Sequence, residues 1–147
     1  MDVLTGANKP ISIKKDVYYE ICCLLKEHHY ESGGIIGMKN DEVAKFQFDS
    51  FASKKLFEYY PNTDFLEKII NESWSQNEIS FAGIVHSHLH NDNISQQDIL
   101  YSRRIIEANR SITELRMGIV DLSKQNDLIR WYLVTRHSVS ECKTVLL

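Results

Sequence analysis

The stretch Gly83-Ile84-Val85-His86-Ser87-His88 decides how this sequence of 147 residues is interpreted. The apolar run from Phe81 to Val85 predicts a buried strand that ends on two histidines. Side chains alternate between the two sides of a strand, so the imidazoles of His86 and His88 leave it on the same side. The sequence therefore predicts two imidazoles held side by side on a rigid element.

A helix is expected to begin shortly after this strand. Ser95 has the position and chemistry of an N-cap, which places Asp98 in the first turn. Asp98 is also the first residue on the core-facing side of this helix, and Tyr101 or Ser102 and then Ile105 follow it on that side. Two imidazoles and one carboxylate are ligands that a catalytic zinc takes, with its fourth position left for water.

Each of these residues also has an ordinary structural explanation. Buried histidines are commonly satisfied by hydrogen bonds in the core, and Ser95-x-x-Asp98 is the pattern of a capping box. Together, however, the histidines are costly to bury unless both rings find partners, and one divalent ion would satisfy them and the aspartate at once. Zinc is favoured over calcium or magnesium because two of the ligands are nitrogen.

His90 continues the alternation of the histidines and is a further candidate ligand. A strand rarely runs straight into a segment such as Asn91-Asp92-Asn93, because these residue types favour turns. Asp98 is therefore the preferred third ligand.

Length and composition predict one domain, residues 1–147, of an ordinary globular protein. The formal net charge of -3 is spread without long runs, which argues against nucleic acid as a partner. No apolar run approaches the roughly 20 residues that cross a bilayer, and no signal-peptide segment is recognised, so no membrane association is expected. Two of the three cysteines, Cys22 and Cys23, are adjacent. They form no disulfide framework, which indicates a cytoplasmic protein, and a thiol nucleophile there would need a nearby base.

The rest of the chain alternates between predicted helices and strands. Helical periodicity runs from Lys15 to about His28, and Asn62 or Thr63 can cap a second helix that reaches Trp74. The third helix covers residues 95–108, and strands are predicted at 10–13, from 35 onward, at 43–51, at 115–121 and at 127–135, the last two as an antiparallel pair. Residues 53–61 are predicted as a strand end and loop. The fold class is mixed α and β (α+β), with a central mixed sheet flanked by about three helices.

Glu31 lies where the first helix gives way to a strand, directly before Ser32-Gly33-Gly34. Two glycines permit backbone conformations closed to other residues, and side chains at such junctions often point into sites built on a rigid scaffold. By itself Glu31 has the properties of a solvated loop residue. Glu31 becomes a candidate site residue only through its relation to the histidine stretch.

The spacing His86-Ser87-His88, six residues, Ser95, two residues, Asp98 resembles the signature of the JAB/MPN metalloproteases, also called JAMM enzymes. The upstream segment Glu31-Ser32-Gly33-Gly34 resembles the glutamate segment of that family, and the resemblance covers roughly residues 11–134. The family usually has proline directly after the second histidine, where this chain has Leu89. The resemblance implies the JAB/MPN, cytidine-deaminase-like fold.

By this resemblance, His86, His88 and Asp98 would hold Zn²⁺. Glu31 would be the general base and acid that moves a proton from the activated water to the leaving amine, and Ser95 would hydrogen-bond the developing oxyanion or the water. The implied activity is that of a deubiquitinase-like peptidase or isopeptidase of the compact prokaryotic branch. The implied substrate is a ubiquitin-like protein or its conjugate, cut after the C-terminal glycine, with activating and conjugating enzymes as associated proteins. Antiviral defence and sulfur-carrier processing are pathways that the resemblance also implies.

Three other functions fit parts of the pattern. A catalytically silent MPN scaffold would act as a binding module, although such scaffolds tend to lack ligands that this chain retains. A RadC-like DNA-associated protein shares the His-x-His and Ser-x-x-Asp pattern and would bind DNA with a steep salt dependence. A Ser–His–Asp hydrolase that uses Ser87 or Ser95 lacks a nucleophile elbow.

Overall fold

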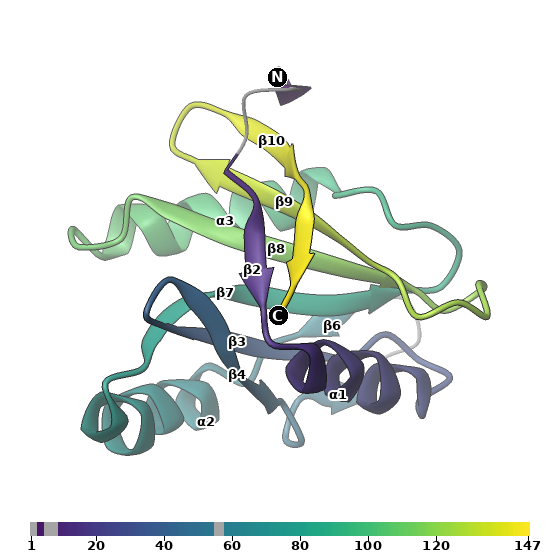
Figure 1. Cartoon of the computed structure of the whole chain (residues 1–147), viewed down its shortest axis with the longest axis horizontal. Helices are drawn as coiled ribbons and strands as arrows, with labels where there is room; N and C mark the ends of the chain where they lie inside the picture. Colours follow the sequence, from purple (N-terminus) through teal and green to yellow (C-terminus); the bar gives the residue numbers. More distant parts are fainter. Residues whose placement is uncertain (1–2, 5–8, 55–57) are drawn as a thin grey trace.

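The computed structural model of the protein describes residues 3–4, 9–54 and 58–147. It shows a nine-stranded mixed sheet with helices on both sides (Figure 1). The strands of this sheet are β1 (Val3–Leu4), β2 (Ile11–Ile13), β3 (Gly33–Lys39), β4 (Glu42–Phe48), β7 (Ser80–His88), β8 (Glu114–Asp121), β9 (Ile129–Thr135), β10 (Val139–Cys142) and β11 (Thr144–Leu146). The helices are α1 (Lys15–Lys26), α2 (Thr63–Lys68), which continues as the π-helical η1 (Ile69–Trp74) and the short η2 (Ser75–Asn77), and α3 (Gln96–Ala108). The predicted mixed α and β class is confirmed.

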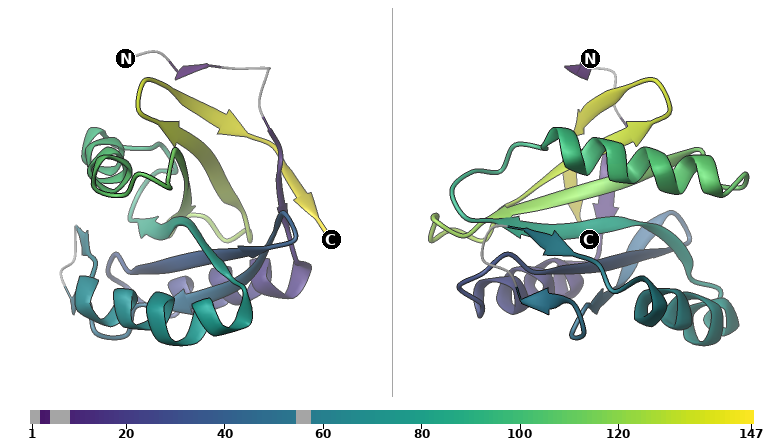
Figure 2. Two further views of the ribbon diagram at one scale, coloured as in Figure 1. Left: turned by 90° about the vertical axis from the view of Figure 1, so that its left-hand side faces the viewer. Right: turned by 180° about the vertical axis from the view of Figure 1, so that it is seen from behind.

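The order of the strands is β1-β10-β9-β8-β7-β3-β4-β2-β11, so β7 lies at the centre. It pairs parallel to β8 and antiparallel to β3. A strand with neighbours on both edges and helices over both faces is expected to be almost continuously apolar, as residues 81–85 are. The sheet curls on itself, because β10 and β11 follow one another in the chain yet lie toward opposite ends of the strand order (Figure 2).

Two hydrophobic clusters fill the two sides of the curled sheet. The first gathers α1 and the inner face of the sheet around residues such as Ile21, Leu25 and Trp131. The second packs α2, η1 and α3 on the other face, around Trp74 and Ile119. None of the helices among the described residues is long and apolar enough to cross a bilayer. The His86–His88 end of β7 therefore emerges between two packed layers rather than from a flexible loop.

Gly83 allows the two central parallel strands to approach one another. A Cβ atom at this position would lie 1.8 Å from the carbonyl oxygen of Arg116 on β8, and the backbone of a central strand cannot move aside. Gly83→Ala is therefore expected to lower the free energy of unfolding by about 3 kcal/mol or more. Urea unfolding would measure the loss, with Ser80→Ala, an exposed position on the same strand, as a control that should stay near the wild-type value.

The structure differs from the sequence prediction at three places. Residues 53–61 were expected to be a strand end and loop, but β5 (Ser53–Lys54) and β6 (Tyr59–Tyr60) pair as a small antiparallel ribbon; residues 55–57 lie outside the described part. The second helix is capped by Asn62, one of the two predicted caps, but it changes to a π-helix after residue 68. The tail, for which no structure was predicted, supplies β10 and β11, whose pairing depends on distant strands.

Candidate metal centre

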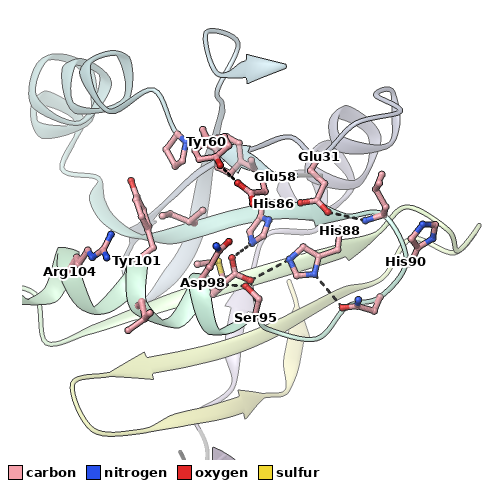
Figure 3. Close-up of a pocket in the computed structure, with 18 residues that line it drawn as sticks. Glu31, Glu58, Tyr60, His86, His88, His90, Ser95, Asp98, Tyr101 and Arg104 are labelled. Carbon is pink, nitrogen blue, oxygen red and sulfur yellow. Dashed lines mark hydrogen bonds and ion pairs between the residues drawn. The ribbon is translucent and has the colours of Figure 1, made fainter. Parts of the chain in front are cut away.

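The end of β7 presents both histidines to one cavity (Figure 3). The ring centroids of His86 and His88 are 4.7 Å apart. Ser87, between them, faces the other way and is fully buried. Its hydroxyl accepts a hydrogen bond from the Ser32 N–H at 3.0 Å and donates one to the Ser32 carbonyl at 3.3 Å. Because Ser32 follows Glu31 directly, this pair of bonds fixes the segment that carries Glu31 against the histidine strand.

Asp98 faces both imidazoles from the first turn of α3. Its Oδ1 lies 2.9 Å from His86 Nε2, and its Oδ2 lies 3.3 Å from His88 Nε2. The same carboxylate completes a capping box, because Ser95 N–H donates to Asp98 Oδ2 and Asp98 N–H donates to Ser95 Oγ. Burial alone would raise the pKa of Asp98, but the two histidines and the Ser95 amide together hold it well below its usual range. The Asp98 side chain thus takes part in the helix cap and contacts both imidazoles at the same time.

Glu31 approaches the histidines from the β3 side. One ligand atom each from Glu31, His86 and His88 forms a group whose members all lie within 4.8 Å of one another. Glu31 Oε2 also accepts a hydrogen bond of 3.2 Å from the Leu89 N–H, a donor that proline at this position would lack. Burial raises the pKa of Glu31, and the neighbouring histidines oppose part of that rise. A carboxyl group with a raised pKa beside two imidazoles is suited to take up and release a proton.

These residues fit a divalent metal ion. Two imidazole nitrogens and a carboxylate are a donor set that zinc prefers. Ligands at about 2.0–2.2 Å from a tetrahedral ion lie roughly 3.3–3.5 Å from one another, close to the separation of His88 Nε2 and Asp98 Oδ2. Neither ring nitrogen of buried His86 has a hydrogen-bond partner of good geometry in the described part of the chain, although Nε2 lies near Asp98. An ion would supply the partner that Nε2 lacks.

Two other predicted candidates have different places. His90 is exposed and points away from the other two rings (Figure 3), because the chain leaves the strand geometry after His88. Among the described residues, the group of potential ligand atoms within 4.8 Å of one another consists of Glu31, His86 and His88, so it includes neither His90 nor Asp98. Ser95 lines the cavity as the N-cap of α3. Its hydroxyl accepts the Asp98 N–H, which leaves the hydroxyl hydrogen available to donate.

An open cleft of about 660 Å³ surrounds these residues. Its walls come from β6, β7, the following loop and α3, and include Tyr60, Leu89, Leu100, Tyr101 and Arg104. A second, largely apolar hollow of about 430 Å³ lies between α2, η1 and α3 and shares Pro61, Ile84 and Tyr101 with the first. The cleft and the hollow are therefore neighbours that share part of their lining.

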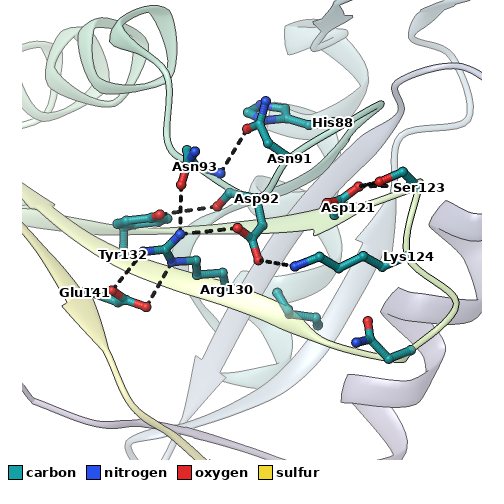
Figure 4. A network of polar contacts seen from close by, with 12 residues as sticks. His88, Asn91, Asp92, Asn93, Asp121, Ser123, Lys124, Arg130, Tyr132 and Glu141 are labelled. Atoms are coloured by element: carbon teal, nitrogen blue, oxygen red, sulfur yellow. Dashed lines mark hydrogen bonds and ion pairs between the residues drawn. The ribbon is translucent and has the colours of Figure 1, made fainter.

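A network of polar side chains anchors the loop that joins β7 to α3 (Figure 4). Arg130 on β9 donates to Asp92 Oδ1 at 3.2 Å and Asn93 Oδ1 at 2.8 Å, and it bonds both carboxylate oxygens of Glu141 on β10. The hydroxyl of Tyr132 donates to the Asp92 carbonyl at 3.2 Å. The path from His88 to Asp98 is thus fixed by the outer strands of the sheet.

Sequence reasoning missed two residues beside the histidines. The ring of Tyr59 stacks against His86 with centroids 6.0 Å apart and an angle of 27° between the planes. Its hydroxyl donates to Asp49 Oδ2 at 2.8 Å, and Asp49 is buried at the end of β4. No local sequence pattern identified either residue, because the burial of Asp49 and its contact with Tyr59 are properties of the folded chain.

The adjacent cysteines do not meet the requirements of a nucleophile. Cys22 is buried in α1, and burial raises the pKa of its thiol to about 11. Cys23 is exposed. We expect Cys23→Ser to be neutral and Cys22→Ser to cost about 1–2 kcal/mol of stability, because it buries a hydroxyl in an apolar cluster. Neither substitution should alter metal content or turnover, which metal analysis and a cleavage assay of each variant would check.

No protein-family model and no curated protein sequence matches the chain. Solved structures do resemble it, and two of them match over nearly its whole length. The solution structure of protein DSY2949 from Desulfitobacterium hafniense matches with 17% sequence identity and a TM-score of 0.73, and the match covers 93% of this chain and 92% of the DSY2949 chain. The crystal structure of AF2198, a JAB1/MPN domain protein from Archaeoglobus fulgidus, is 15% identical and covers 94% of this chain and 100% of its own, with a TM-score of 0.53.

Fold and site together define the class of this protein. It is a mixed α/β protein with a candidate metal centre of two histidines and an acidic residue at the end of a central strand. Its fold is that of an MPN/JAB domain.

Proposed function

We propose that this chain is a zinc-dependent peptidase or isopeptidase that cuts after the C-terminal glycine of a ubiquitin-like protein or its conjugates. The observation that carries the proposal is the convergence of two imidazole Nε2 atoms on Asp98 beside the Glu31 carboxylate. The MPN/JAB fold is consistent with it.

His86, His88 and Asp98 would hold the zinc ion. When bound, zinc supplies a Lewis acid that polarises a carbonyl and lowers the pKa of a coordinated water toward about 7. The residues that would hold the ion line the open cleft, where a substrate can reach them.

Glu31 is the proton carrier of the proposed reaction. Its carboxylate lies within 4.8 Å of the histidine nitrogens, and the Leu89 N–H holds one of its oxygens, so the other is free to accept a proton. It takes a proton from the attacking water and delivers it to the leaving amine. Ser95 donates its hydroxyl hydrogen to the oxygen on which charge develops, while the Asp98 N–H keeps the hydroxyl in place.

The cleft suits an extended substrate tail. It has the apolar hollow beside α2 as a neighbour, and a tail that ends in glycine can pass close to the histidines because it carries no side chain there. Main-chain hydrogen bonds along such a cleft would provide affinity, and the side chains that line it would select the residues. Activating and conjugating enzymes of the same ubiquitin-like protein are proposed as associated proteins, in the cytoplasm.

Metal analysis combined with a cleavage assay tests the proposal. Purified protein should contain about one zinc ion per chain and should release a reporter amine fused to the terminal glycine of a ubiquitin-like protein. Replacement of the penultimate glycine by leucine should abolish that release. A protein that binds zinc but cleaves no member of a panel of such fusions would instead be a scaffold. DNA binding with a steep salt dependence would favour the RadC-like alternative.

A further inference from the structure

Gly33 leaves a gap opposite the first histidine of the metal centre. It is the cross-strand neighbour of His86 in the pairing of β3 with β7. A Cβ atom at Gly33 would lie 2.7 Å from His86 Cβ and 2.8 Å from Cε2 of Tyr59. The edge of the Tyr59 ring therefore occupies the space that any larger residue at position 33 would fill.

Asp49 holds the Tyr59 ring in that gap. The carboxylate is only 3% exposed, and its Oδ2 accepts hydrogen bonds of 2.8 Å from both the Tyr59 hydroxyl and the Asn62 N–H. The Asp49 N–H donates to the Gly33 carbonyl at 2.9 Å. Through its side chain and its backbone N–H, this one buried residue thus joins the end of β4 to the start of β3, to β6 and to the cap of α2. Burial and the Asp49 charge both raise the pKa of Tyr59, so the phenol stays protonated as the donor.

His86 depends on packing for its orientation. A metal-binding histidine usually donates its second ring N–H to a carboxylate or a carbonyl, which fixes the plane of the ring. The Nδ1 of His86 has no hydrogen-bond partner in the described part of the chain. The ring that packs against His86 from the side of Gly33 is Tyr59.

We propose that Tyr59 is a positioning residue for the metal centre: its ring, seated over Gly33 and anchored by Asp49, sets the plane of His86 and so directs Nε2 toward the ion. The inference rests on the metal site of the proposed function and does not depend on the reaction or its substrate. It also explains why a β5–β6 ribbon is placed against the end of the central strand.

Zinc affinity of three tyrosine variants tests this role. Tyr59→Leu should bind zinc about 10- to 100-fold more weakly than the wild-type protein, the usual cost of losing a group that orients a ligand. Tyr59→Phe, which keeps the ring, should stay within about 3-fold of wild type. Tyr19→Leu, which changes an exposed tyrosine of α1 outside the lining of the cleft, should leave zinc affinity unchanged. Competition with a chelating dye would give the affinities, and thermal melting would show that each variant folds.

The absorption of bound cobalt gives a second measurement. Tyr59→Leu should alter the Co²⁺ spectrum, because the direction of one nitrogen ligand changes, whereas Tyr59→Phe should reproduce the wild-type spectrum. Wild-type affinity and spectrum in a folded Tyr59→Leu protein would overturn the inference and leave the proposed metal site intact. Equal losses in Tyr59→Leu and Tyr59→Phe would overturn it too, because the hydroxyl rather than the ring would then be decisive. A wild-type protein that binds neither ion would overturn both this inference and the proposed function.

Discussion

Glu31→Gln is expected to retain zinc and the fold while the rate of cleavage falls by about 10²- to 10⁴-fold, the usual contribution of a general acid and base. Glutamine has nearly the shape of glutamate, and its amide oxygen can still accept the Leu89 N–H that now bonds Glu31. It cannot take up a proton. Steady-state kinetics on a ubiquitin-like fusion, together with zinc content of the same preparation, would measure the effect.

A matched substitution separates this effect from a change in net charge. Glu72 is an exposed glutamate on η1, so Glu72→Gln should be fully active. Full activity of Glu31→Gln would show that another group carries the proton. Loss of zinc from that variant would instead make Glu31 a ligand, an arrangement that its position within 4.8 Å of both histidine nitrogens permits.

The parts of the site that depend on local geometry could be predicted from the sequence. Alternation along β7 places His86 and His88 on one side whatever the rest of the fold does. The cap of α3 places Asp98 in its first turn, and both hydrogen bonds of the capping box are present. Glu31 was identified from a family resemblance, because its proximity to the histidines depends on the pairing of β3 with β7, in which Gly33 lies opposite His86, a residue 53 positions later (86 − 33).

The surroundings of the site could not be predicted, because their signals are not periodic. Tyr59 belongs to a two-residue strand, too short to show alternation. Its position depends on the glycine at position 33, which has no side chain to occupy the same space, and on the buried carboxylate of Asp49, ten residues earlier in the chain. The hydrogen bonds from Arg130 join β9 to the loop after His88, and no local sequence pattern relates these two parts of the chain.

The same distinction holds for the fold. Periodicity and capping signals located the helices and most strands, since these properties are read within a few residues. The order of the strands follows from packing of the whole chain. In particular, β11 pairs with β2 at the other end of the chain, and a three-residue exposed segment carries no sign of that partner.

Asp98→Asn is expected to abolish zinc binding, with an affinity loss greater than the roughly 100-fold that accompanies loss of an outer-shell group. The carboxylate faces both Nε2 atoms, and an amide has neither its charge nor its second acceptor oxygen. The amide oxygen can still accept the Ser95 N–H, so α3 should keep its cap. Zinc titration against a chelating dye would measure the loss, and activity should disappear with the metal.

Ser95→Ala is the matched control, because it removes the other half of the capping box. It should lower the free energy of unfolding by about 1 kcal/mol and leave zinc affinity close to wild type, since no ligand is lost. His88→Ala should behave like Asp98→Asn and lose metal and activity together. If Asp98→Asn bound zinc as tightly as wild type, the carboxylate would be a cap alone. The third ligand would then have to be Glu31, the other acid within reach of both imidazoles.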